Sequence, residues 1–138
     1  MKNLNYLILD EEHKNIVENI KSTDKATILT VNNFKGGVGK STLINLFAYI
    51  MEKNEIKTLL IDSDPQRTLT KKILKNFVIE EKAKKSFMQG IQSNSLKDSI
   101  TKLTPFLSII EGDWELSTLD RYARQNLTLD AEYYLYQY

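Results

Sequence analysis

The sequence predicts an α/β fold in which helices cover a parallel sheet. Three apolar runs of strand length, residues 26–31, 56–61 and 106–110, are separated by longer segments with helical patterns of apolar residues. Strands that alternate with helices form parallel sheets, because each helix crosses back to the start of the next strand. We therefore expect a Rossmann-like three-layer α/β/α arrangement over residues 26–138, preceded by an N-terminal arm, residues 1–25.

A glycine-rich segment, Lys35–Thr42, lies between the first predicted strand and a predicted helix over residues 43–51. Glycines let the backbone curl so that successive N–H groups face one concavity, and the following helix begins with unpaired N–H groups. This arrangement is typical of a phosphate-binding loop. In such a loop Lys40 contacts the outer phosphates, Ser41 offers its hydroxyl to Mg2+, and Thr42 donates to an inner phosphate. An ordinary turn before an ordinary helix would explain the glycines, but not the agreement of glycines, Lys-Ser and flanking elements.

A second polar cluster, Asp62–Gln66, follows the second predicted strand. Ligands bind beyond the carboxyl ends of strands in an open α/β sheet, so this cluster is expected at the same rim as the glycine-rich loop. Asp62 and Asp64 lie on one side if the extended geometry persists, and Pro65 holds Asp64 out of the helical region. Asp-x-Asp-Pro is also typical of a turn with a helix cap. Beside the phosphate-binding loop we favour the functional interpretation.

The two motifs together resemble those of the ParA/MinD ATPases, a P-loop family with a deviant Walker A motif. Lys35–Thr42 looks like that motif, and Leu59–Gln66 resembles the family's Walker A′ motif. The Asp-Pro-Gln ending is similar to that of the ParA (Soj-like) plasmid and chromosome partition branch. The resemblance is dense over residues 26–66 and resumes faintly over residues 106–113 and 115–119.

The resemblance implies ATP as the ligand, with Mg2+ as its companion ion. Lys35 would reach across a nucleotide-sandwich dimer to the partner's phosphates, so hydrolysis would depend on dimer formation. Lys35, Lys40 and Asp64 would be the catalytic residues, Asp64 by orienting or activating the attacking water. Ser41 and Asp62 would hold or support the hydrated Mg2+. The nucleotide-binding residues would be Lys35, Gly36, Gly37, Val38, Gly39, Lys40, Ser41 and Thr42.

The chain departs from the family in its turns and in its length. Arg67 and Thr68 stand where the family usually has glycine and asparagine, and the turn Glu111–Asp113 lacks the usual proline. Family members continue into a strand that ends in Walker B/switch II and lies beside the strand that feeds the phosphate loop. This chain ends at Tyr138, about where that strand should begin. We expect an incomplete N-terminal half of the domain, with an unpaired edge at residues 26–31 and weak or absent ATP turnover alone.

For the intact protein the resemblance implies ATP-driven dimerisation and hydrolysis in plasmid or chromosome segregation. The implied partners are a second copy of the chain, a centromere-binding ParB-like protein and nonspecific DNA. No membrane partner is implied. Which cargo or replicon it serves is not readable from these residues.

Three other functions deserve comparison with this one. A MinD-like positioning ATPase needs a C-terminal amphipathic helix, which this sequence lacks. A non-enzymatic remnant could bind nucleotide or pair with full-length copies. The tyrosine-rich end, residues 133–138, is reminiscent of bacterial tyrosine kinases, but it follows an unfinished core, and we expect a packed helix over residues 131–138.

Composition predicts a single cytoplasmic domain. Apolar residues make up 41% of the chain and charged residues 27%, which is typical of a globular protein. No run approaches a transmembrane length, and no secretory pattern opens the chain. The absence of cysteine excludes disulfides and thiolate zinc sites. The net charge of +1 gives no overall footprint for nucleic acid, and we interpret a group of lysines as the solvated face of amphipathic helices: Lys71, Lys72, Lys75, Lys82, Lys84 and Lys85.

Further elements follow from caps and apolar spacing. In the arm, Asp10 should cap a helix that runs to about Lys21 and packs on the sheet or contacts a partner; His13 should be a surface residue on its polar face. Asn54 should end the helix after the glycine-rich loop. Helices are also predicted over residues 66–77, 80–91 and from Asp113 to about Gln125, with a short helical or irregular crossover over residues 95–103.

Overall fold

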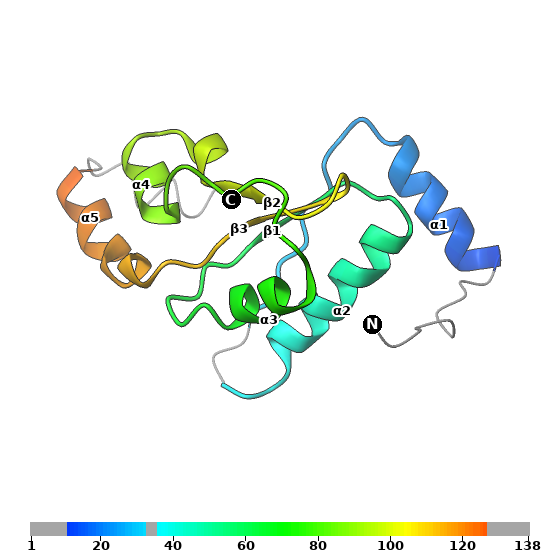
Figure 1. The fold of residues 1–138 in the computed structure, drawn as a ribbon, viewed down its shortest axis with the longest axis horizontal. Helices are drawn as coiled ribbons and strands as arrows, with labels where there is room; N and C mark the ends of the chain where they lie inside the picture. Colours follow the sequence, from blue (N-terminus) through cyan, green and yellow to red (C-terminus); the bar gives the residue numbers. More distant parts are fainter. Residues whose placement is uncertain (1–10, 33–35, 127–138) are drawn as a thin grey trace.

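The computed structural model describes residues 11–32 and 36–126 (Figure 1). In chain order the elements are α1 (Glu11–Ser22), α2 (Lys40–Lys53), β1 (Thr58–Ile61), α3 (Thr68–Asn76), α4 (Phe87–Gln92), η1 (Leu96–Ser99), β2 (Ile100–Lys102), β3 (Leu107–Ile110), η2 (Trp114–Thr118) and α5 (Leu119–Asn126). The two η elements are short 3-10 helices.

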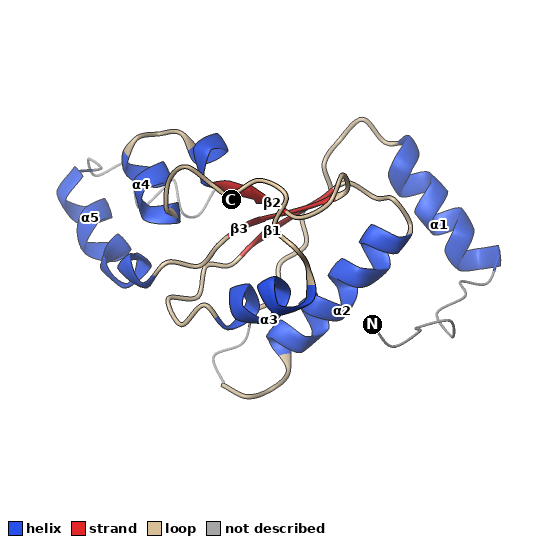
Figure 2. Cartoon of the chain, viewed as in Figure 1, coloured by secondary structure: helices blue, strands red, loops and turns tan. Residues whose placement is uncertain are grey.

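A mixed three-stranded sheet, in the order β1-β3-β2, lies at the centre of the molecule (Figure 2). β1 and β3 are parallel, with Thr58 opposite Leu107 and Ile61 opposite Ile110. This parallel pair with helices between its strands confirms the predicted α/β fold. β2 is antiparallel to β3 and falls in a segment that was predicted to be helical or irregular. Only four residues separate β2 from β3, and such a short connection can join antiparallel strands but cannot cross over to a parallel one.

The predicted strand over residues 26–31 is wrong, because the structure shows no regular element there. Ile28 is 87% exposed and Leu29 is 61% exposed. A strand is held by hydrogen bonds to a neighbouring strand, and in the described part of the chain no strand pairs with this segment. Apolar, β-branched residues alone therefore did not make a strand.

The hydrophobic core lies between one face of the sheet and the helices α2 and α3. Along β1 the side chains alternate: Leu60 is buried in this core, whereas Leu59 and Ile61 are exposed on the opposite face. The rings of Tyr49 and Phe77 lie 4.9 Å apart and join α2 to the end of α3. The buried cluster consists of Ala48, Leu60, Leu69, Ile73, Leu103, Leu107 and Ile109.

Caps set the ends of several helices where the sequence predicted them. Asn54 ends α2, since both its backbone N–H and its side-chain amide donate to the Ile50 carbonyl. Asp113 accepts a hydrogen bond from the N–H of Glu115 and starts the helical segment that becomes α5. This segment begins as the 3-10 helix η2, so the predicted α-helix is shorter than expected.

The helix predicted over residues 80–91 is wrong in its first half. Ser86 forms a capping box with Gln89, so α4 begins only at Phe87. The backbone before it bonds to distant segments instead of to itself: the N–H groups of residues 80 and 81 donate to the Lys102 carbonyl, and those of 84 and 85 donate to the Asp98 carbonyl. Lys82, Lys84 and Lys85 consequently do not lie on an amphipathic helix.

The arm helix α1 forms as predicted but does not lie on the sheet. In Figure 1 it is at the right-hand end of the molecule, beyond α2, and Ile16 on its apolar face is half exposed. Asp10, the side chain of His13 and the predicted helix over residues 131–138 fall outside what the structure describes. None of the helices in the described ranges is long and apolar enough to span a bilayer.

Replacing Ile73 by alanine should lower the free energy of unfolding by about 2–5 kcal/mol, because it leaves a cavity at a side chain with no exposed surface. The matched change Ile28→Ala removes the same atoms from a side chain that is 87% exposed, and should alter stability by less than about 0.5 kcal/mol. Urea unfolding followed by circular dichroism measures both values. A comparable loss for Ile28→Ala would show that residues 26–31 are packed after all.

Candidate functional site

The glycine-rich loop is an exposed turn that leads directly into α2. Gly37 has a φ of 74° and Gly39, the residue before α2, has a φ of 92°. Side chains rarely adopt this left-handed backbone, so glycine is required here by conformation. Space is not the reason, since a Cβ added at either position would meet no atom within 4 Å. The backbone of this loop is therefore shaped by its glycines and remains open on its outer side.

The first turn of α2 contains the predicted phosphate-binding residues Lys40, Ser41 and Thr42. Lys40 is the first residue of the helix, and Ser41 and Thr42 follow it. The N–H groups of Thr42 and Leu43 bond to the Gly39 carbonyl, no side chain caps the helix, and its first turn contains no Asp or Glu. A helix N-terminus carries a partial positive charge that favours an anion. Lys35 and the two residues before it lie outside the described residues.

Asp62, at the end of β1, is buried and organises the start of α3. Its Oδ2 accepts hydrogen bonds from the N–H of Thr70 at 2.8 Å and from the Thr70 hydroxyl at 2.6 Å. Its Oδ1 accepts from the N–H of Asp64 at 3.2 Å. The side chain is only 4% exposed, so these bonds replace the water that it loses on burial. The helix-capping interpretation of the Asp-x-Asp-Pro motif thus describes part of what Asp62 does.

Thr70 also joins β1 to the turn after β3. While its hydroxyl donates to Asp62, it accepts a hydrogen bond from the N–H of Gly112 at 2.8 Å. Gly112 approaches so closely that a Cβ there would lie 2.9 Å from the Asp64 carbonyl oxygen and 3.0 Å from Asp62 Oδ2. Any side chain at this position would push the two turns apart. The sequence analysis missed both Thr70 and this use of Gly112, although a glycine close to a strand is a signal of close backbone approach.

Asp64 lies in a different environment from Asp62. It is exposed, and its Oδ1 accepts a hydrogen bond from the N–H of Gln66 at 2.9 Å. The extended geometry ends here, because the N–H of Arg67 bonds back to the Asp64 carbonyl and Arg67 adopts a φ of 59°. Arg67 takes this strained conformation at the position where we noted an arginine in place of the expected glycine.

Helix α3 connects the acidic segment to the first turn of α2. Thr70, in its first turn, binds Asp62, and Lys72 donates from Nζ to the Thr42 hydroxyl at 2.6 Å. One turn further on, the side-chain amide of Asn76 donates to Asn45 of α2 at 3.2 Å. The two predicted groups of site residues are thus attached to one short helix. The sequence analysis missed this role of Lys72, which no local pattern signals.

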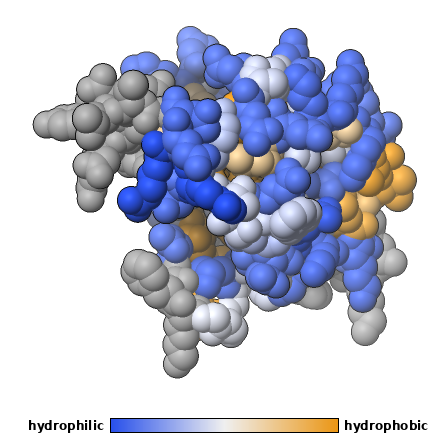
Figure 3. Space-filling view, turned by 90° about the vertical axis from the view of Figure 1, so that its left-hand side faces the viewer, coloured by the Kyte–Doolittle hydropathy of each residue, from blue (hydrophilic) through white to orange (hydrophobic). Residues whose placement is uncertain are grey.

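A partly buried glutamate, Glu111, binds several polar and charged side chains, Arg67 among them. It accepts hydrogen bonds from Lys82 at 2.5 Å, from Thr101 at 2.8 Å and from Arg67 at 3.2 Å. Burial by itself raises the pKa of Glu111, but the bonds from Lys82 and Thr101 and the charges of Lys82 and Arg67 outweigh it, so the pKa lies below its ordinary value. The cluster borders a hollow of about 280 Å³ between residues 82–87 and 111–113. The adjoining face, at the α4–α5 end, is mostly hydrophilic (Figure 3).

A left-handed glycine turn that leads into a helix beginning Lys-Ser is the turn-and-helix part of a P-loop, although the residues before it form no strand here. Comparison with known families agrees with this class. The family model described as an AAA domain (AAA_31) matches residues 26–135, and the chain belongs to this family.

Two curated relatives show similarity over most of the chain. A protein named "Putative replication protein A" from Sinorhizobium fredii is 30% identical over 110 residues, which cover 76% of this chain and 26% of that protein. "Uncharacterized protein MJECL24" from Methanocaldococcus jannaschii is 31% identical over 108 residues, which cover 71% of this chain and 41% of the relative. The aligned part of the chain thus covers less than half of the length of either relative.

The Thr70→Val variant should lose about 1–3 kcal/mol of unfolding free energy. Valine keeps the shape of threonine but removes the hydroxyl, so the Gly112 N–H is left without its acceptor and Asp62 loses its shortest hydrogen bond. Thr70→Ser keeps the hydroxyl and is the matched control for the polar contribution. Denaturant unfolding of the three proteins measures the difference. If serine and valine cost the same, the hydroxyl is not what joins the two turns.

The Glu111→Gln variant should be less stable than the wild type at neutral pH, and the difference should shrink in acid. A carboxylate with a depressed pKa in the folded protein stabilises it fully above the pKa of the unfolded chain, and this stabilisation is lost as pH falls through the lower folded pKa. Urea unfolding at a series of pH values measures the gap. Glu81→Gln, which breaks the exposed pair with Lys102, is the control and should change stability little. A gap for Glu111→Gln that stays constant into the acid range would contradict the charged role of Glu111.

Proposed function

We propose that this chain binds ATP with Mg2+ at Lys35–Thr42 and forms the N-terminal part of a ParA-type partition ATPase. The observation that carries the proposal is the left-handed turn at Gly37 and Gly39, which opens directly onto the uncapped, acid-free N-terminus of α2. Membership of the AAA domain family supports a nucleotide as the ligand. The paired motifs of the partition branch are the basis for the finer assignment.

The residues of the loop have separate parts in this proposal. Lys40 binds the outer phosphates, Thr42 binds an inner phosphate, and Lys35 reaches the phosphates of a second copy of the chain. Ser41, half-buried in the first turn of α2, offers its hydroxyl to the metal ion. When bound, Mg2+ neutralises charge on the phosphate oxygens. Within residues 11–32 and 36–126 no three acidic, His or Cys side chains converge as metal ligands, which fits an ion held mainly by phosphate and water.

The two aspartates have unequal parts. Asp64 is exposed at the carboxyl end of β1, where it can orient a water molecule for attack on the terminal phosphate. Asp62 is buried and bonded to Thr70 and to the N–H of Asp64. It therefore holds in place the turn that carries Asp64, and it supports the hydrated Mg2+ from that position.

We infer that the activity of the whole protein goes beyond this chain, since the aligned residues cover only 26% and 41% of the two relatives. We propose an ATP-dependent homodimer that acts in the cytoplasm on DNA cargo, with a ParB-like centromere-binding partner and nonspecific DNA. The relative named for replication supports a role in maintaining a replicon. The exposed apolar side chains of Ile28, Leu29, Leu59 and Ile61 support the idea that a further part of the ATPase domain packs against them.

Lys40→Ala should weaken the binding of ATP with Mg2+ at least about tenfold, because it removes a charge-assisted hydrogen bond to the outer phosphates. The control is Lys53→Ala, which makes the same change on an exposed residue at the opposite end of α2 and should bind like the wild type. Isothermal titration calorimetry measures the affinities. No binding by the wild type, or equal binding by Lys40→Ala, would overturn the proposed function.

Asp64→Ala should keep ATP binding and slow ATP hydrolysis in a full-length protein.

A further inference from the structure

We infer that Lys72 is a second cation of the nucleotide site and binds the inner phosphate that ATP and ADP share. This inference rests on the proposed nucleotide site and adds a residue from outside the glycine-rich motif. The observation behind it is the 2.6 Å hydrogen bond from Lys72 Nζ to the Thr42 hydroxyl, across 30 positions of sequence. Thr42 is the residue to which we assign the inner phosphate, so the ammonium group lies beside the residue assigned to that phosphate.

The position of Lys72 is enforced by contacts on both sides of it in α3. Thr70 holds the start of the helix to Asp62, and Asn76 holds its end to Asn45 of α2. Ile73 is completely buried, which fixes the rotation of the helix about its axis. Lys72 is half-buried between these contacts. Its side chain is therefore directed at the first turn of α2 by the packing of the whole helix.

The positive charge of Lys72 at the first turn of α2 favours a bound anion there. Lys72 forms no ion pair among the described residues; its partner there is the neutral hydroxyl of Thr42. Its ammonium group lies at the first turn of α2, a helix end that already carries partial positive charge and has no acidic residue. A phosphate between this helix end and Lys72 would turn their repulsion into attraction.

Assignment to the inner phosphate separates Lys72 from Lys40. Lys40 serves the outer phosphates, so its loss should penalise ATP more than ADP. Lys72 lies beside Thr42, and the inner phosphate is present in both nucleotides. Removal of the Lys72 charge should therefore weaken both by the same factor. Because α3 also binds Asp62 through Thr70, a nucleotide held by Lys72 would be linked to the acidic turn through one helix.

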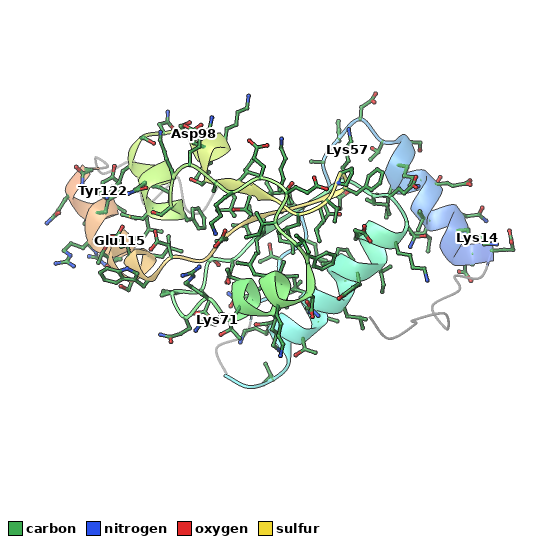
Figure 4. All side chains as sticks on the ribbon, viewed as in Figure 1. Lys14, Lys57, Lys71, Asp98, Glu115 and Tyr122 are labelled. Atoms are coloured by element: carbon green, nitrogen blue, oxygen red, sulfur yellow. The ribbon has the colours of Figure 1, made fainter. Side chains whose placement is uncertain are left out.

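The test uses Lys72→Met in the full chain, because methionine keeps the aliphatic stem and removes the charge. Calorimetry with ATP and with ADP, each with Mg2+, should show about a tenfold loss for both nucleotides. Lys72→Arg should restore most of the affinity. The matched control is Lys71→Met on the exposed side of α3 (Figure 4), which should bind both nucleotides like the wild type. Melting without nucleotide should differ little between the variants, which separates lost binding from lost packing.

Several outcomes would overturn the inference. Wild-type affinity in Lys72→Met, a loss confined to ATP, or an equal loss in Lys71→Met would each remove Lys72 from the inner phosphate. If Lys72→Met melts early and Lys72→Arg melts normally but binds as weakly as methionine, the contact serves packing only. Failure of the wild type to bind either nucleotide is a distinct result, since it overturns the proposed site itself and the role of Lys72 with it.

Discussion

The buried carboxylate of Asp62 is the contact on which the described structure most depends. It sits at the end of β1 and receives two hydrogen bonds from Thr70, whose hydroxyl in turn accepts one from Gly112 after β3. The end of one strand, the start of a helix and the turn after a second strand are therefore held at one point. A carboxylate buried here without hydrogen bonds would lower the free energy of unfolding, so the three segments stabilise one another's positions. The absence of a side chain at Gly112 is what allows them to approach.

This arrangement also places the chemistry of the proposed site. With its first turn held by Asp62, α3 lies along α2 and brings Lys72 to the Thr42 hydroxyl. Asp64 remains exposed just beyond the buried Asp62, in a turn tightened by the left-handed Arg67. The glycine-rich loop and the acidic turn belong to different parts of the sequence, and one nine-residue helix contacts both. In the proposed site this connection would hold the phosphates and an acidic group in one arrangement.

Several side chains around the sheet show how far local preference extends. Residues 26–31 are apolar and β-branched, yet they form no strand, because a strand needs hydrogen bonds from a neighbour. Leu59 and Ile61 are exposed on the face of β1 away from the core. Residues 80–86 have a helical pattern, yet their backbone bonds to β2 and to the segment around Asp98. For residues 26–31 and 80–86, the hydrogen bonds available from neighbouring segments decided the structure, and the local pattern did not.

The sequence by itself determined the α/β class, the glycine-rich loop, α2 with its stop at Asn54, the positions of β1, α3 and β3, and the cap at Asp113. Their signals are local, because apolar spacing, glycines and caps are read within one segment. Only the tertiary structure decided the antiparallel β2, the burial of Asp62 and the direction of Lys72. It also decided that residues 26–31 form no strand and that residues 80–86 form no helix. Their partners are distant: 42 positions separate Gly112 from Thr70, and 30 separate Lys72 from Thr42. Which residues meet over such separations depends on how the elements pack, and a pattern within one segment cannot contain that information.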